Sequence, residues 1–467
     1  MTEPVASTEP IASTNPVASV VEPPRGILPT LGALGPGIIV AGSVIGGGEL
    51  INAPIQAATF GFVLLWAALL ACVLKYFLQV EIGRYAILHN STTFEALNLC
   101  PGPKIAGISW ISWIYMVGYT VTQVGLVGIL LAIAGLLSAM FPLGPFAEYS
   151  VTIWGILVYG LTQFLLWRSR YAGLEKIVMV LVALFSLAVI FALVLIQGTS
   201  YRIAMSDIVS GLQFSFGHQP ALATVAVISM IGALGTTANE LFQYPYWLLE
   251  KGFSNHIGPP GAQNRVSRAQ GWIRVLRIDV GVSTLIATFI TAAFFLLGAA
   301  VFFGRADVPK GIGVVNEISA IFTVTYGHGS HLLFGVGAVA TLFSTLLISS
   351  AASGRMGADL LGTMGVLERS DATAVHCWQQ RFHTFYLGCV FVVFLLLKGN
   401  QPPAVIVIFA QFVSGLFLTP LLMFSVGWLA FHTEKPLRMS WLSGACLVVS
   451  IVVVCGCIVA ALAARFG

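Results

Sequence analysis

The stretch GSVIGGGELINAP, residues 42–54, lies inside the first apolar segment that is long enough to cross a membrane. It carries three consecutive glycines, Gly46, Gly47 and Gly48, followed directly by the carboxylate of Glu49. Glycine weakens a helix, and an uncompensated charge is costly in hydrocarbon. Irregular backbone is tolerated at membrane depth only where it is buried in protein or lines a cavity. The stretch therefore predicts a helix that is interrupted at a central site.

A second stretch, MIGALGTTANELFQYPYW (residues 230–247), repeats this pattern. Small and polar residues again interrupt an apolar run before a carboxylate, Glu240, and a leucine follows each glutamate, at Leu50 and Leu241. Because the second stretch lies five spans after the first, an odd number, the second unit enters the membrane inverted, as in inverted-repeat transporters. We expect Glu49 and Glu240 to face each other at a central site. The alternative is that each carboxyl is protonated or hydrogen-bonded and only joins helices.

The composition sets the class of protein. Of the 467 residues, 57% are hydrophobic and only 9% are charged, which indicates an integral membrane protein. The formal net charge of +4 is too small and too dispersed for nucleic-acid binding. The seven cysteines form no CxxC pair, and the sequence has neither HExxH nor GxSxG, so disulfide frameworks and enzymes of those types are excluded.

The sequence predicts eleven membrane spans. The apolar windows of sufficient length fall at about 33–60, 61–88, 106–138, 150–167, 174–197, 221–249, 279–304, 331–362, 380–399, 404–431 and 440–464. Most Lys and Arg residues fall on one side when the N-terminus is placed in the cytoplasm, as the positive-inside rule requires. We therefore expect a multi-pass plasma-membrane protein with a cytoplasmic N-terminus and an outer C-terminus.

The chain divides into a short tail and one membrane domain. Residues 1–30 are rich in Pro, Ser and Thr, which predicts a disordered cytoplasmic tail. Residues 31–467 form the predicted transmembrane domain. We expect its two inverted repeats at about 31–200 and 218–432, and one additional helix at 440–464.

Several motifs carry a family resemblance. They are LGPGIIVAG (residues 34–42), FGFVLLWAALLACVLKYFLQ (60–79), SSAASGRMGADLLG (349–362) and AQFVSGLFLTP (410–420). With them, roughly residues 31 to 432 resemble the natural-resistance-associated macrophage protein (Nramp) family of divalent metal transporters. The resemblance implies an all-α fold of the leucine-transporter type. It has five plus five inverted spans, one further helix, and discontinuous first and sixth spans.

The site motifs depart from the family pattern. The family's Asp-Pro-Gly-Asn is replaced by Gly46-Gly47-Gly48-Glu49, and its Met-Pro-His-Asn corresponds to Thr237-Ala238-Asn239-Glu240. The thioether that favours soft metals is absent, and the oxygen donors that remain suit hard cations such as Mn²⁺ or Mg²⁺. We expect Glu49 and Glu240 to be the metal ligands. The expected binding site comprises Gly46, Gly47, Gly48, Glu49, Thr237, Asn239, Glu240 and Gln411.

Lys75 lies within the second span, one helical turn before Gln79. It can pair with Glu49 or Glu240 as an internal cation, which argues against a divalent substrate. Alternatively it pairs with Glu81 or extends to the membrane boundary.

Coupling and gating residues follow from the remaining polar positions. The third span has no carboxylate, and Gln123 is its most polar residue. The sixth has no histidine, so the family's usual proton path is missing. Arg355 and Asp359 are spaced i, i+4, which suits a helix-surface ion pair or an inner gate. We retain Lys75, Gln123, Arg355 and Asp359 as coupling or gating candidates.

The function predicted from these features is secondary active transport of a divalent metal cation, by alternating access around the central site. The cation is the substrate, no cofactor is expected, and H⁺ or Na⁺ is the expected coupling ion of a symporter. The alternative is cation- or proton-coupled transport of a small organic solute on the same fold. A membrane enzyme or a scaffold without transport activity explains the two glutamates less well.

Overall fold

The computed structural model describes residues 20–34, 37, 45–168, 172–304, 319, 322–323, 326–327, 329–397, 402–433 and 437–466. Residues 1–19 of the expected tail lie outside the described residues. The prediction of a disordered tail as far as residue 30 is wrong at its end, because α1 begins at Ile27 and the Val21 carbonyl accepts from Trp272 Nε1. The first half of the described chain contains α1 (Ile27–Ala33), η1 (Gly47–Asn52), α3 (Ala53–Phe60), α4 (Leu65–His89), α5 (Thr93–Leu97), β1 (Lys104–Ile105), β2 (Ile108–Ser109), α6 (Trp110–Thr122), α7 (Val124–Met140), η2 (Gly144–Tyr149), α8 (Ser150–Arg168), α9 (Ala172–Leu195), η3 (Ile196–Gly198) and α10 (Met205–Gly211). The second half contains α11 (Pro220–Ala233), α12 (Ala238–Glu250), α13 (Phe253–His256), α14 (Arg265–Phe302), α17 (Ser330–Thr363), α18 (Ala372–Leu397), α19 (Pro403–Val413), η4 (Ser414–Leu418), α20 (Thr419–Phe431) and α21 (Trp441–Phe466).

Ten helical segments among the described residues are long and apolar enough to cross a membrane. They correspond to the second through eleventh windows predicted from the sequence. The first window is only partly described, from Ile45 onward, so a total of eleven spans stays a prediction. The seventh span is longer than expected, because α14 begins at Arg265 rather than at 279.

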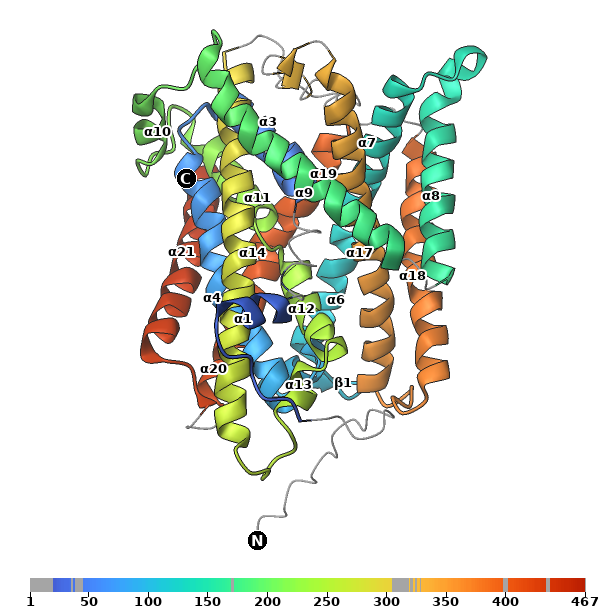
Figure 1. Cartoon of the computed structure of the whole chain (residues 1–467), viewed down its shortest axis with the longest axis vertical. Helices are drawn as coiled ribbons and strands as arrows, with labels where there is room; N and C mark the ends of the chain where they lie inside the picture. The colour runs from blue at the N-terminus through green and yellow to red at the C-terminus, as the bar shows by residue number, and fades with distance from the viewer. Residues whose placement is uncertain are drawn as a thin grey trace.

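The helices form one bundle, with the long helix α14 running vertically through its left part in this view (Figure 1). There α14 packs against α4 and α3, while α17 packs against α18, α7 and α9. Helix α9 crosses the bundle obliquely over α14 and α17 in this view. The short hairpin of β1 and β2 is antiparallel, with Lys104 opposite Ser109.

Two helices are interrupted where the sequence predicted it. The sixth span is divided into α11 in the upper half of the bundle and α12 below it (Figure 1), with Leu234–Thr237 between them. The first span is a tight π-helical turn, η1, that continues into α3. The first-span interruption, η1, contacts α11, α19 and α14, while the two halves of the sixth span contact α4 and η4. Together these contacts position the candidate site.

Candidate functional site

The interruption of the sixth span, which we call the sixth-span break, comprises Leu234, Gly235, Thr236 and Thr237. Gly235 has φ +64°, a left-handed conformation that glycine adopts without strain. Its Cα faces the backbone of Cys72 on α4, where a Cβ would stand 2.9 Å from the Cys72 Cα. The break therefore requires glycine both for its conformation and for its close packing.

The lower half-helix, α12, begins with a capping box. The Thr237 backbone N–H donates to Glu240 Oε2 at 2.7 Å, and the Glu240 N–H donates to Thr237 Oγ1 at 3.3 Å. These bonds satisfy backbone donors that the helix end leaves without partners. The Glu240 carboxylate also lies at the positive end of the half-helix dipole. The sequence pattern Thr-x-x-Glu is thus used at membrane depth to start a helix.

Side chains from other elements hold the rest of the sixth-span break. Lys75 Nζ on α4 donates to the Leu234 carbonyl at 2.7 Å. The Gly235 N–H donates to Glu49 Oε1 at 3.1 Å, and Thr236 Oγ1 donates to Gln79 Oε1 at 2.9 Å. Glu49, Lys75 and Gln79 are all at most 1% exposed. Three consecutive residues of the break are therefore each bonded by a buried side chain.

A polar link joins three helices beside the first-span interruption. Asn52 Nδ2 donates to Ser229 Oγ on α11 at 2.9 Å and to Gln411 Oε1 on α19 at 2.7 Å. Ser229 in turn donates to the Ile408 carbonyl at 3.4 Å. Gln411 is thus fixed by a residue of the first span.

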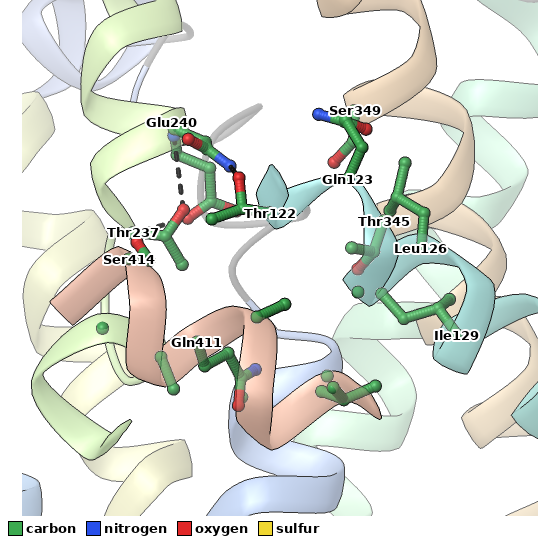
Figure 2. A pocket seen from close by; sticks show the side chains of 18 of the residues that line it. Thr122, Gln123, Leu126, Ile129, Thr237, Glu240, Thr345, Ser349, Gln411 and Ser414 are labelled. Carbon is green, nitrogen blue, oxygen red and sulfur yellow. Dashed lines mark hydrogen bonds between the residues drawn. The ribbon is translucent and has the colours of Figure 1, made fainter. Parts of the chain in front are cut away.

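A cavity of about 100 Å³ lies between the two interruptions and α6, α7, α17 and α19. Figure 2 shows Glu240, Thr237 and Thr122 on one side of it, Gln123, Thr345 and Ser349 on another, and Gln411 on a third. Its lining residues are Gly47, Gly48, Tyr119, Thr122, Gln123, Gly125, Leu126, Ile129, Gly232, Ala233, Thr237, Asn239, Glu240, Gln243, Thr345, Ser349, Val407, Ala410, Gln411 and Ser414. The cavity is the candidate binding site.

Most residues of the predicted site line this cavity. Gly47, Gly48, Thr237, Asn239, Glu240 and Gln411 do so, and so does Gln123. Asn239 Nδ2 donates to Thr122 Oγ1 at 3.1 Å, and Tyr115 OH donates to Asn239 Oδ1 at 3.4 Å. The role of these residues in binding stays a prediction.

Glu49 is placed differently from the expectation. It is completely buried but does not line the cavity. The π-helical turn that follows Gly46 directs its Oε1 toward the Gly235 N–H and toward Thr291 Oγ1 on α14, which donates at 3.2 Å. The structure therefore does not bring Glu49 and Glu240 together in one cavity, and Gly46 also lies outside the lining.

Lys75 does not pair with Glu81. Glu81 pairs instead with Arg84 on its own helix at 2.6 Å, and Arg84 also donates to the Leu437 carbonyl. Lys75 is directed at the sixth-span break and interacts electrostatically with Glu49 and Glu240. Lys75 thus lies near the glutamates, as the first interpretation expects, but its Nζ bonds the Leu234 carbonyl and it does not line the cavity, so it does not take the place of a divalent substrate.

The i, i+4 pair of Arg355 and Asp359 was also predicted wrongly. Arg355 pairs with Glu250, at the end of α12, at 2.6 Å, and its guanidinium lies 4.5 Å from the ring centroid of Trp247. The side chains at i and i+4 diverge because each finds a partner on another element. Both residues lie away from the cavity lining.

Asp359 belongs to a cluster of polar side chains at the junction of α12, α17 and α5. Its Oδ2 accepts from Tyr246 OH at 2.7 Å, and its Oδ1 pairs with Arg369 at 2.8 Å. Arg369 also pairs with Glu95 of α5. Partial burial lowers the pKa of the Arg369 guanidinium to about 10, which leaves it charged at neutral pH. The cluster ties α12 to α17 and α5.

Sequence reasoning missed the hydroxyl groups of the cavity. Thr122, Thr345, Ser349 and Ser414 line it, although their neighbours in sequence are mostly apolar. Thr122 directly precedes Gln123, where α6 gives way to α7, so a polar pair inside an apolar span was the available signal. For the others, a Ser or Thr in a membrane helix carries no such signal, since its hydroxyl can bond to the backbone of its own helix.

No group of three or more His, Cys, Asp or Glu side chains that could hold a metal occurs in the described part of the chain. Among the described residues that line the cavity, Glu240 is the one carboxylate. The other donors are hydroxyl and amide side chains. A cation in this cavity would keep part of its water shell.

The fold and the site are those of a multi-pass membrane protein in which paired, interrupted helices surround a central polar cavity. The family profile described as natural resistance-associated macrophage protein-like (Nramp) matches residues 37–464. The chain belongs to the Nramp family.

Two relatives illustrate the similarity. The divalent metal cation transporter MntH of Xylella fastidiosa is 23% identical over 393 residues, which cover 83% of this chain and 75% of that protein. An uncharacterized protein of Pasteurella multocida is 25% identical over 324 residues, covering 68% of this chain and 67% of that protein.

Solved structures share the fold. The Eremococcus coleocola manganese transporter, in complex with an aromatic bis-isothiourea substituted compound, superposes with a TM-score of 0.64 at 18% identity, covering 97% of this chain and 92% of that chain. MhsT in complex with L-phenylalanine superposes with a TM-score of 0.55 at 16% identity, covering 92% and 98%. These similarities confirm the expected all-α membrane fold of the leucine-transporter type.

Proposed function

We propose that this protein is a secondary active transporter of a hard divalent cation, Mn²⁺ or Mg²⁺, which binds in the central cavity. Family membership supports this, as do two similar proteins named as a divalent metal cation transporter and a manganese transporter. Alternating access moves the two halves of the bundle around the cavity. The inverted repeats at about 31–200 and 218–432 are the units that we expect to move.

The donor set of the cavity is the observation that carries the proposal. It offers one carboxylate, Glu240, together with the amides of Asn239, Gln123 and Gln411 and several hydroxyl groups. Such oxygen donors suit Mg²⁺ or Mn²⁺, and Mg²⁺ is often held by one or two carboxylates while keeping several waters. A cavity of about 100 Å³ has room for several waters around an ion.

The residues then have distinct roles in the proposal. Glu240 supplies the charge that attracts the cation, while Asn239 and Gln411 supply neutral ligands. Because Gly47 and Gly48 have no side chains, the backbone of the first span lines the cavity directly. Glu49 acts from behind the cavity by holding the Gly235 N–H, rather than as a ligand.

Uptake of Mn²⁺ and Mg²⁺ into proteoliposomes tests the proposal. Wild type is compared with Glu240→Gln and with Glu148→Gln, an exposed glutamate of η2 that serves as the matched control. We expect saturable uptake by wild type and by Glu148→Gln, and at least a tenfold loss in Glu240→Gln. Folded wild-type protein that moves neither ion would overturn the proposal.

Coupled transport of a small organic solute is the second candidate. The excess of neutral amides and hydroxyls over carboxylates in the cavity favours it, because such groups orient a polar solute by hydrogen bonds. Uptake of labelled amino acids by the same proteoliposomes, in the presence and absence of Mn²⁺, distinguishes the two functions. Competition between the amino acid and Mn²⁺ would place both in one cavity.

The cellular setting belongs to the same proposal. The distribution of Lys and Arg supports a plasma-membrane protein with its N-terminus in the cytoplasm and its C-terminus outside. Accessibility of single cysteines introduced at exposed loop positions, measured in intact cells, tests this orientation.

A further inference from the structure

A charged cluster lies behind the cavity, around the sixth-span break. We call it the break cluster and define it as Glu49, Lys75, Gln79, Thr236 and Thr291. None of these five residues lines the cavity. All are buried, and the proposed binding of substrate uses none of them as a ligand. The cluster therefore needs a role of its own.

Lys75 is the cationic member of the break cluster, and its side chain is only 1% exposed. Its Nζ donates to the carbonyl of Leu234, the residue directly after the last one of α11. The Leu234 N–H is still bonded to the Met230 carbonyl, so Leu234 completes the half-helix. The ammonium thus lies at the negative end of a helix dipole, beside carbonyls that have no partner within the helix.

Glu49 lies on the other side of the break, where its carboxyl group faces the backbone of Gly235. Its Oε1 accepts from the Gly235 N–H and from Thr291 Oγ1, and its carboxylate interacts electrostatically with Lys75. A buried ammonium is strongly destabilising unless opposite charge and carbonyl oxygens compensate it. The break cluster supplies both kinds of group. The Lys75 ammonium thus binds the sixth-span break through the Leu234 carbonyl.

Transporters with interrupted helices commonly hold a coupling cation with unwound backbone carbonyls and the C-terminal ends of half-helices. Lys75 makes that type of contact here, but through a covalently attached cation. We infer that the Lys75 ammonium is the built-in cation of the sixth-span break, which keeps the break formed with no Na⁺ bound there. Lys75 is a positioning residue, since it acts on Glu240 and the cavity through Leu234 and the residues that follow.

One consequence of the inference, that Mn²⁺ uptake needs no Na⁺, rests on the proposed transport function. The role of Lys75 itself is tested without transport, by the unfolding temperature of the full-length protein in detergent. The variants are Lys75→Met, which keeps most of the side-chain volume without charge, and Lys75→Ala, which removes the equivalent of propylammonium. Lys251→Met, at an exposed lysine just after α12, is the matched control.

We expect Lys75→Met and Lys75→Ala to lower the unfolding temperature by several degrees, and Lys251→Met to leave it unchanged. Added n-propylammonium chloride should restore Lys75→Ala saturably, because the ion fits the space that the side chain leaves. It should not restore Lys75→Met, where that space is filled. Tetraethylammonium, which is too large, should restore neither.

Two results would overturn the inference. One is a Lys75→Met variant that is as stable as wild type. The other is a saturable rise in the unfolding temperature of wild type with NaCl, compared with choline chloride at equal ionic strength. The second measurement needs no variant, so it decides the matter even if the Lys75 variants fail to fold.

Transport is measured separately. We expect wild-type Mn²⁺ uptake to be unchanged when choline replaces Na⁺, and a loss of uptake in the absence of Na⁺ would count against the inference. If wild type moves no Mn²⁺ at all, the proposed function fails, while the unfolding measurements still decide the role of Lys75.

Discussion

The two interrupted helices meet at one cavity but are built in opposite ways. At the first, glycines remove side chains, and a Cβ on Gly48 would overlap the carbonyl oxygen of Ala233. At the second, side chains of other elements bond to the backbone or side chain of the break: Lys75, Glu49 and Gln79 each bond to one residue of the sixth-span break. The first interruption is thus maintained by close packing of backbone, and the second by buried polar bonds.

The difference has a physical reason. Irregular backbone in a membrane must satisfy its polar groups within the protein. The π-helical turn of the first span bonds most of its own backbone, so it needs only room. In the sixth-span break, the groups of Leu234, Gly235 and Thr236 named above bond to side chains of α4 and η1, so the break needs donors and acceptors from those elements. Substitutions that add a side chain where the backbone is closely packed therefore test the first interruption. Substitutions that remove a buried hydrogen-bond partner test the second.

Gly48→Ala should have the largest effect. Its Cβ would meet backbone, which cannot move aside, and overpacking of this kind costs about 3 kcal/mol. Gly47→Ala is the adjacent control, because its nearest neighbour is a methyl group of Val407 at 3.2 Å, which can shift. The yield of monodisperse protein and its unfolding temperature measure both. Equal behaviour of the two variants would refute the packing account of the first interruption.

Thr236→Val should have the next largest effect. It removes the hydroxyl that donates to Gln79 Oε1 at 2.9 Å and leaves a buried amide oxygen unbonded, which costs about 1–3 kcal/mol. Adding Gln79→Leu to this variant should recover part of the loss, because both polar partners are then gone. The unfolding temperatures of the two single variants and the double variant check this. Additive losses would show that the bond does not hold the break.

Thr237→Ala should cost about 1 kcal/mol, the usual value for a lost N-cap. Thr237→Ser keeps the oxygen that accepts from the Glu240 N–H and should remain close to wild type. Thr92→Ala removes the equivalent oxygen from the capping box of α5, near the inner surface, and provides a comparison outside the break. If Thr237→Ala were no less stable than Thr237→Ser, the cap would have no part in starting α12.

Arg355→Met should have the smallest effect. Arg355 pairs with Glu250, whose side chain is 50% exposed. Exposed ion pairs contribute less than about 1 kcal/mol to the free energy of unfolding. The variant lies away from both interruptions and sets the baseline for the others. A gating role would appear instead as altered Mn²⁺ uptake at an unchanged unfolding temperature.

Local features of the sequence predicted the fold well. Long apolar windows located ten described membrane helices, because a span must bury about 20 apolar residues whatever its neighbours are. Gly46–Gly48 before Glu49, and the small and polar residues before Glu240, located both interruptions, because such a break in an apolar run is a property of a few adjacent residues. Whether the repeats have the predicted boundaries stays a prediction.

The direction of each polar side chain was not predictable in the same way. Glu49 and Glu240 occupy matching sequence positions, yet only Glu240 lines the cavity. Arg355 and Asp359 have the spacing of a pair, yet each bonds to another element. In each case the packing of segments that are distant in sequence decided which partner the side chain reaches.

The sequence by itself thus determined a multi-pass membrane protein with two interrupted helices, because hydropathy, glycine runs and caps act locally. Only the tertiary structure decided that Lys75 is directed at the carbonyl of Leu234 and that Glu49 lies behind the cavity. The reason is that α4, α14 and the two interruptions are far apart in sequence. Which buried charges compensate one another depends on how those segments pack.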